Sequence, residues 1–402
     1  MKRQYVASER AHFMCPNMHF GMIVEIDKNY NKDQVEATFW RMAEAHPFLK
    51  SLIAYEEGTD NIYYHVTDYS QINIVVRNNE SSLWSDYKKI SEKDWNVFEN
   101  GMLRVYIYPK QQGMTLLFVA HHLLVDGRGL LELAEEFAND YVGEKTPVYA
   151  EEVLMESIDD LPPKSKLAGI SKMLVKRMNK LWAKENHTVN YEQYAQFVET
   201  YSKNHPVDFE TYEVEKESVM QMAQVCKEHG FSMNDLLMAH MYVKTGTEKI
   251  IIAADIRNKF AKYQRGSLGN YSTAMGIAYK AKSSDVITVA KEVRAVVQKH
   301  LQNNRTLMLV LACYFEMSPA LLDAAAISAL KGFESKAAGF VGAGMFGFGE
   351  PKSHSITNLG KVENEHIKSL TFIPPASPAA KFTLGVVTLN GTMKACSSSN
   401  HV

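Results

Sequence analysis

The expected fold is decided by one stretch, residues Gly113 to Tyr141, which reads GMTLLFVAHHLLVDGRGLLELAEEFANDY. An apolar run of strand length leads into two adjacent histidines, His121 and His122, and Asp126 and Gly127 follow after three apolar residues. A helix is predicted next, because apolar residues recur on one helical face: Leu130, Leu133, Ala134, Phe137, Ala138 and Tyr141. The histidines are therefore expected where a buried strand gives way to a packed helix.

A histidine at such a junction suits proton transfer. An alcohol or amine that attacks a thioester carbonyl must lose a proton, and only histidine has an unperturbed pKa that lets it accept one near neutral pH. Adjacent strand residues face opposite ways, so His121 and His122 should play different roles. A lone buried histidine is usually a core residue, but a doublet followed by Asp-Gly at this spacing favours a site.

The pattern H-H-x-x-x-D-G at residues 121–127 resembles the signature of the condensation-domain and chloramphenicol acetyltransferase-like acyltransferase superfamily. The resemblance implies that His122 is the catalytic base and that Asp126 forms a salt bridge that shapes the site. Gly127 completes the signature, and His121 is expected to support the site. The sequence is most similar in character to standalone alcohol acetyltransferase-like and polyketide-associated members.

Segments of the C-terminal half are similar to the same superfamily. DIRNKF at 255–260 and LGNYSTAM at 268–275 resemble motifs of the second lobe, where an arginine often pairs with the motif aspartate. Arg257 is the predicted partner of Asp126, with Arg104 and Arg128 as alternatives, because a buried carboxylate needs a cation. SHSITNLGKV at 353–362 resembles the strand that faces the histidine. The residues expected to bind the substrate and the oxyanion are Ser355, Thr357, Asn358, Asn270 and Tyr271. For each of them, the alternative is an ordinary structural role.

The resemblance implies an α/β fold of two chloramphenicol acetyltransferase-like lobes, each a mixed sheet covered by helices, with a tunnel between them. We expect the N-terminal lobe at 1–160, a linker at 161–188 and the C-terminal lobe at 189–402, because the composition shifts to prolines and acidic residues after Gly143. A closing hairpin is predicted around Asn390-Gly391, a strong type I′ turn signal.

The linker contains a predicted basic amphipathic helix from Lys164 to Lys184. It has no acidic residue, its apolar side is formed by Leu167, Ile170, Leu174, Met178 and Leu181, and its cations are Lys164, Lys166, Lys172, Lys176, Arg177, Lys180 and Lys184. Such a helix can dock on an anionic membrane or on an acidic partner such as an acyl carrier protein. The alternative is a solvated helix face packed on the enzyme.

Two further features have structural interpretations. His240 lies among apolar residues of a predicted helix and is expected in the core. Gly342, Gly344 and Gly347 spell G-x-G-x-x-G, but no strand precedes them and Gly349 and Pro351 follow. A flexible loop is therefore predicted there instead of a dinucleotide site.

Composition sets outer limits on the function. A net charge of -2 gives no reason to expect nucleic acid as a partner, and no apolar run approaches membrane-spanning length. Four scattered cysteines, Cys15, Cys226, Cys313 and Cys396, indicate neither a zinc site nor a disulfide framework, so a reduced cytoplasmic compartment is expected.

The sequence therefore predicts an acyltransferase that moves an acyl group from acyl-CoA or an acyl carrier protein thioester to a small-molecule alcohol or amine. No metal and no tightly bound cofactor are expected. The alternative is a non-catalytic relative that binds an acyl chain or a carrier protein. Because imidazolium cannot accept a proton, activity should fall in acid, and a profile flat down to about pH 5 would count against a histidine base.

Overall fold

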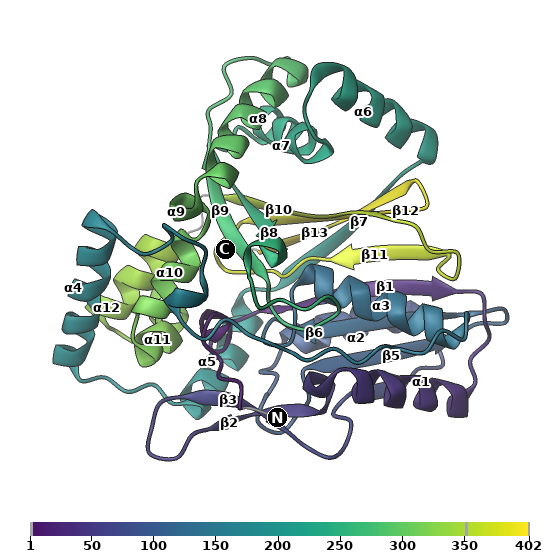
Figure 1. Cartoon of the computed structure of the whole chain (residues 1–402), viewed down its shortest axis with the longest axis horizontal. Coiled ribbons are helices and arrows are strands. Elements are labelled where there is room, and N and C mark those ends of the chain that lie inside the picture. Colours follow the sequence, from purple (N-terminus) through teal and green to yellow (C-terminus); the bar gives the residue numbers. More distant parts are fainter. Residues whose placement is uncertain (1–2, 350–352, 401–402) are drawn as a thin grey trace.

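Two mixed β-sheets and the helices around them form the part of the chain that the computed structural model describes, residues 3–349 and 353–400 (Figure 1). Each sheet combines parallel and antiparallel pairs. A separate two-stranded ribbon is made of β2 (Ser51–Tyr55) and β3 (Ile62–Val66). The predicted mixed α/β fold class is confirmed.

The first sheet has β6 at its centre. Its order is β11-β1-β6-β5-β4, with the bounds Ser369–Ile373, His19–Ile26, Met114–His121, Leu103–Pro109 and Asn73–Val76. All residues of β6 are buried, because both neighbours pair with it and α1 (Lys32–Ala45) and α3 (Gly127–Tyr141) cover the sheet. The apolar run before the histidines is thus the core strand predicted for it.

The second sheet is formed by strands of the C-terminal half. Its order is β7-β13-β12-β10-β8-β9, with the bounds Val207–Val214, Thr392–Asn400, Phe382–Leu389, His354–Val362, Lys249–Asp255 and Ser272–Ala278. The predicted hairpin joins β12 to β13, and both turn residues have positive φ, 50° at Asn390 and 97° at Gly391. That conformation fits the type I′ turn predicted for Asn-Gly.

The helices form two groups in the upper and left parts of Figure 1. One group lies beside the second sheet and consists of α6 (Lys216–His229), α7 (Met233–Thr245) and α8 (Val286–Gln302). The other is built from α4 (Gly169–Glu185), α9 (Asn304–Leu307), α10 (Leu309–Glu316), α11 (Pro319–Ala329) and α12 (Lys336–Gly339). Two more helices, α2 (Leu83–Ser91) and α5 (Tyr191–Asn204), pack against the first core.

The two sheets are not cleanly separated along the sequence. β11 lies within the range expected for the C-terminal lobe, yet it is the edge strand of the first sheet and pairs with β1. It also packs against β12 and β13 of the second sheet. The boundary predicted at 161–188 therefore does not account for this strand.

Three local predictions are wrong. Residues Phe340–Phe346 form a π-helix directly after α12 instead of a flexible loop; Pro351 lies outside the described residues. The glycine serves close packing, because a Cβ at Gly342 would lie 2.1 Å from the carbonyl oxygen of Ala325 in α11. His240 is exposed on α7, because neighbouring positions of the helix, including Met241, face the core instead.

The third error concerns the start and part of the apolar side of the linker helix, which is otherwise present as predicted, with Met178 buried. It begins at Gly169, and its buried side is formed by Val175, Met178 and Trp182. Ile170, which was assigned to the apolar side, is 78% exposed.

Within the described residues no single helix has the length and apolarity that crossing a bilayer requires, and only α10 and α11 together meet that test, as a pair bent by 114°.

Candidate active site

The turn between β6 and α3 is held rigidly by backbone contacts. The amide of His121 donates to the carbonyl of Met102 at 2.9 Å, and that of His122 donates to Met18 at 2.8 Å. The hydroxyl of Tyr64 donates to the carbonyl of Leu123 at 2.6 Å. The two histidines therefore have fixed positions at the end of the central strand.

His121 and His122 face different surroundings, as strand geometry predicts. The ring of His121 lies 5.9 Å from that of Trp95, and its Nδ1 accepts a hydrogen bond from the amide of Leu123 at 3.2 Å. Burial, with the nearby charges of His19, His122 and Arg104, lowers the pKa of His121 to about 3. His121 is therefore a neutral packing residue, whereas His122 borders a cavity.

A cavity of about 260 Å³ lies in front of His122. Its walls come from the N-terminal segment, β8, β9, β10, β12, α10 and the π-helix. Apolar walls dominate at Ile251, Leu311 and Phe346, and the polar groups include His12, His122, Asn270, Ser272, Ser355, Thr357 and Thr383. The cavity thus places His122 of the first sheet opposite polar groups of the second.

His122 is set to be neutral. Burial lowers the pKa of His122 to about 4, although the carboxylate of Asp126 and the carbonyls of His122 and Val125 partly offset this effect. Its Nδ1 is buried without a hydrogen-bond partner of standard geometry among the described residues. A neutral ring that borders a cavity can accept a proton near neutral pH, which is what a general base must do.

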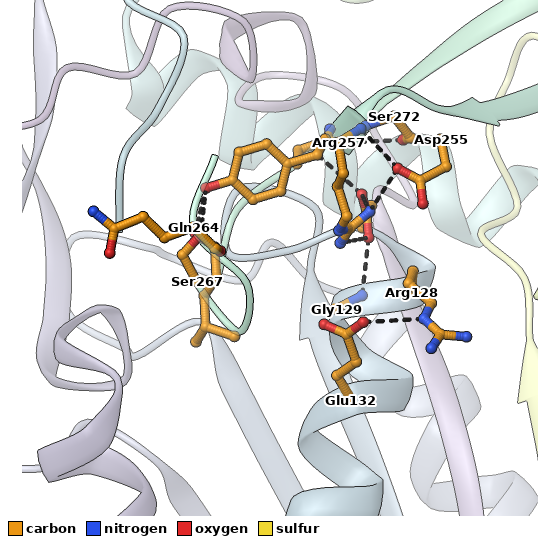
Figure 2. A network of polar contacts seen from close by, with 12 residues as sticks. Arg128, Gly129, Glu132, Asp255, Arg257, Gln264, Ser267 and Ser272 are labelled. Carbon is orange, nitrogen blue, oxygen red and sulfur yellow. Dashed lines mark hydrogen bonds and ion pairs between the residues drawn. The ribbon is translucent and has the colours of Figure 1, made fainter. Parts of the chain in front are cut away.

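Asp126 is buried and fully paired. Its carboxylate accepts two hydrogen bonds from the Arg257 guanidinium, both at 2.9 Å, and one each from the amides of Gly129 and Tyr271, also at 2.9 Å. Figure 2 shows Arg257 above the start of α3, close to Gly129, with Asp255 on its other side. The pairing of Asp126 with Arg257 predicted from the sequence is present, and it joins the start of α3 to the segment that follows β8 of the second sheet.

The two alternative arginines are engaged elsewhere. Arg104 lies over the Trp95 ring at 4.0 Å, and Arg128 pairs with Glu132 at 3.0 Å (Figure 2). Gly127 is the first residue of α3, where a Cβ would lie 3.0 Å from Leu359 Cδ2. Gly127 therefore allows close approach between α3 and the second sheet and supplies no chemical group.

The five expected substrate and oxyanion residues divide into two groups. Asn270, Ser355 and Thr357 line the cavity. Tyr271 does not, because its hydroxyl is buried against the carbonyl of Val153 at 3.0 Å, and only its amide reaches the site, through Asp126. Asn358 does not either: it precedes a bulge in β10, and its side chain accepts from the amide of Gly360 at 2.9 Å. These two expectations are corrected.

The structure adds His12, which the sequence reasoning missed. His12 ends a short 3-10 turn, Arg10–His12, and its ring stacks on that of His122 with centroids 4.5 Å apart. No motif marks it, because a single histidine far from the signature is brought to the site only by tertiary packing. Ser272, two residues after Asn270, also lines the cavity and was missed.

Within the described residues, no group of three or more His, Cys, Asp or Glu could hold a metal ion.

The fold and this site together define a condensation-type protein. Residues 16–259 match the family model described as "Condensation domain", which covers more than half of the chain. The chain therefore belongs to the condensation-domain family. A search of curated proteins finds no match.

Solved structures show the same fold at low identity. The epimerization domain from the third module of tyrocidine synthetase B has a TM-score of 0.60 at 13% identity, over 98% of this chain and 88% of that one. Polyketide synthase associated protein 5 from Mycobacterium tuberculosis has a TM-score of 0.60 at 13% identity, over 100% and 92% of the two chains. Trichothecene 15-O-acetyltransferase from Fusarium sporotrichioides has a TM-score of 0.63 at 11% identity, over 100% and 91%.

Proposed function

We propose that the protein is an acyltransferase that moves an acyl group from a thioester to an alcohol or amine, with His122 as the general base. The observation that carries this proposal is the neutral ring of His122, which is fixed at the end of β6 and borders a cavity between the two sheets. Membership of the condensation-domain family and structural similarity to a named O-acetyltransferase support acyl transfer as the reaction class.

The proposed reaction follows from these groups. His122 removes the proton from the acceptor as its oxygen or nitrogen bonds to the carbonyl carbon of the thioester. The carbonyl electron pair moves to oxygen and forms an oxyanion. When the carbon–sulfur bond breaks, the thiolate takes the proton from His122 and leaves as a thiol. Neutral donors that face the cavity from the second sheet, Asn270, Ser355 and Thr357, are proposed to stabilise the oxyanion.

The donor is proposed to be acyl-CoA or an acyl carrier protein, and the acceptor a small molecule. If the cavity is part of the predicted tunnel, the donor and the acceptor would enter it from different sides. The apolar walls at Ile251, Leu311 and Phe346 suit an acyl chain, because they offer no hydrogen bonds and reward apolar burial.

The test of this function is thiol release from a panel of acyl-CoA thioesters with simple alcohol and amine acceptors. We expect release by the wild type and a loss of roughly 10²- to 10⁴-fold in His122→Ala, the usual contribution of a general base. His240→Ala, which removes an exposed histidine from α7, is the matched control and should keep wild-type rates. Absence of release with every CoA and carrier-protein donor would favour a non-catalytic acyl-binding protein.

A carrier-protein donor is proposed to dock on α4. Lys172, Lys176 and Lys180 are exposed on this helix, beside Met173, which is 66% exposed. The helix packs against α10, which lines the cavity. Lys176→Glu with Lys180→Glu should raise KM for a carrier-protein thioester and leave KM for the matching acyl-CoA unchanged. Equal effects on both donors would remove α4 as the docking surface.

A further inference from the structure

The N-terminal segment brings a second imidazole to the cavity. The Arg10 guanidinium forms a two-pronged, buried ion pair with Asp323 of α11, and the amide of Val6 donates to the carbonyl of Ile62 in β3 at 2.9 Å. These contacts hold the segment to both lobes. His12 therefore has a defined place, with its ring stacked on His122 at an interplanar angle of 29°.

The hydrogen bonds around Asn270 determine which nitrogen of His12 carries the proton. The Asn270 Oδ1 accepts from the backbone amide of Ser272 at 3.4 Å, a group that can only donate, and from the Ser272 hydroxyl at 2.9 Å; this leaves Nδ2 facing His12. An amide nitrogen only donates, so His12 Nδ1, at 3.3 Å, must be the acceptor. In a neutral imidazole the proton then lies on Nε2. No hydrogen bond from a protein group to His12 Nε2 is seen in residues 3–349 and 353–400, and the ring lies in the cavity wall.

We propose, on the basis of the proposed acyl transfer, that His12 is a second catalytic residue whose Nε2–H donates a hydrogen bond to the oxyanion of the tetrahedral intermediate. His12 lines the same cavity as His122, so both rings can reach one reacting carbonyl. His12 keeps its proton throughout. The carbonyl electron pair moves onto oxygen as the acceptor bonds to carbon, and it returns when the carbon–sulfur bond breaks, while His122 alone carries the transferred proton.

Its surroundings keep His12 uncharged. Burial lowers the pKa of His12 well below its ordinary value, and the charges that His122 and His121 would carry lower it further. A second positive charge stacked on His122 would oppose the proton transfer to that ring. A neutral imidazole avoids this repulsion and still donates one hydrogen bond, which is a known electrophilic role of histidine.

The first arm of the test needs no activity. In protein labelled with ¹⁵N-histidine, the His12 resonances are assigned by their absence from His12→Phe. At pH 7 we expect a protonated Nε2 and a bare Nδ1. A protonated Nδ1, or an imidazolium, would overturn the proposal.

The second arm measures thiol release. His12→Phe keeps an aromatic ring for the stack and removes the donor, so kcat should fall roughly 10²- to 10³-fold, the usual effect of losing one oxyanion donor, with KM near the wild-type value. His12→Gln restores a hydrogen-bond donor and should recover part of the lost kcat. His240→Phe, the matched change on the surface, should leave kcat unchanged. An unchanged kcat in His12→Phe, or an acid limb that moves with this substitution, would overturn the donor role. Failure of the proposed acyltransferase function would look different from failure of the His12 role. In that case the wild type would release no thiol, or His122→Ala would release thiol at the wild-type rate.

Discussion

Two segments beside the cavity bury carboxylates in opposite ways. At the start of α3, Asp126 is 2% exposed and accepts four hydrogen bonds, two of them from Arg257. In the N-terminal segment, Glu9 is 0% exposed, and neither of its oxygens has a hydrogen-bond partner of standard geometry among the described residues; the Ser8 hydroxyl and nearby backbone amides offset its burial only in part. Burial raises the pKa of Glu9 to about 7. A buried carboxylate without strong partners is therefore harder to ionise, because burial disfavours its charged form.

The comparison assigns different tasks to the two segments. Asp126 and Arg257 join α3 to the segment that follows β8, and their hydrogen-bond network leaves no free group there to meet a substrate. The N-terminal segment instead places Ser8 and His12 in the cavity wall and tolerates incomplete pairing. Unsatisfied polar groups of this kind often occur at functional sites.

Removing the carboxylate of Asp126 should have the largest effect on stability. Asp126→Ala leaves the buried Arg257 guanidinium with only the exposed Asp255 carboxylate, 3.3 Å away, as a counter-charge. Breaking a buried ion pair in this way typically costs about 3–5 kcal/mol in the free energy of unfolding. Denaturant unfolding measures this loss. The double variant Asp126→Ala, Arg257→Met removes both charges and should be more stable than Asp126→Ala alone. An Asp126→Ala variant as stable as the wild type would show that the Asp126–Arg257 pair does not stabilise the structure.

Neutralising Glu9 should stabilise the protein. Its folded pKa of about 7 lies above the ordinary 4.5, so the unfolded chain ionises first, and stability is lost as pH rises from about 4.5 to about 7. Glu9→Gln cannot ionise and should exceed the wild type by about 3 kcal/mol at pH 8 and by far less at pH 4. The control is Glu217→Gln on the exposed surface of α6. A pH-independent difference would contradict the account.

The dependence of kcat/KM on pH should be weaker than the stability effects predicted for Asp126 and Glu9. His122 must be neutral to accept a proton, and its pKa is lowered to about 4. Hence kcat/KM should be flat from about pH 7 to pH 5 and fall tenfold per pH unit below about 4. The sequence analysis assumed an ordinary histidine pKa, so that activity unchanged down to pH 5 would have counted against a histidine base. The lowered pKa of His122 reverses that expectation. An acid limb near 6.5 would mean that the His122 ring is solvated in the working enzyme.

Local pattern and the family resemblance predicted the features that depend on neighbouring residues. The apolar run into His121 predicted the buried strand, and alternation along a strand predicted that His121 and His122 face apart. The resemblance also supplied Arg257, although it is 131 residues away from Asp126. Features of this kind are carried by a period or a motif, which a single sequence can display.

Features that depend on tertiary packing could not be predicted. Tyr271 lies beside the site, but its ring turns into the core and only its amide reaches Asp126. Asn358 alternates with Ser355 and Thr357 along β10 and so lies on the opposite face from the cavity, which the family resemblance did not distinguish. His12 reaches His122 through long-range contacts of its segment, which include the pairing of Arg10 with Asp323 of α11 across 313 residues.

The central claim is that His122 is free for chemistry, while Asp126 stabilises the structure through its pairing with Arg257. Its most direct test measures thiol release and the unfolding free energy of His122→Ala and Asp126→Ala side by side, under one set of conditions. The account predicts that His122→Ala loses release at near wild-type stability, and that Asp126→Ala loses several kcal/mol of stability, about 3–5. Release at the wild-type rate by His122→Ala would contradict it.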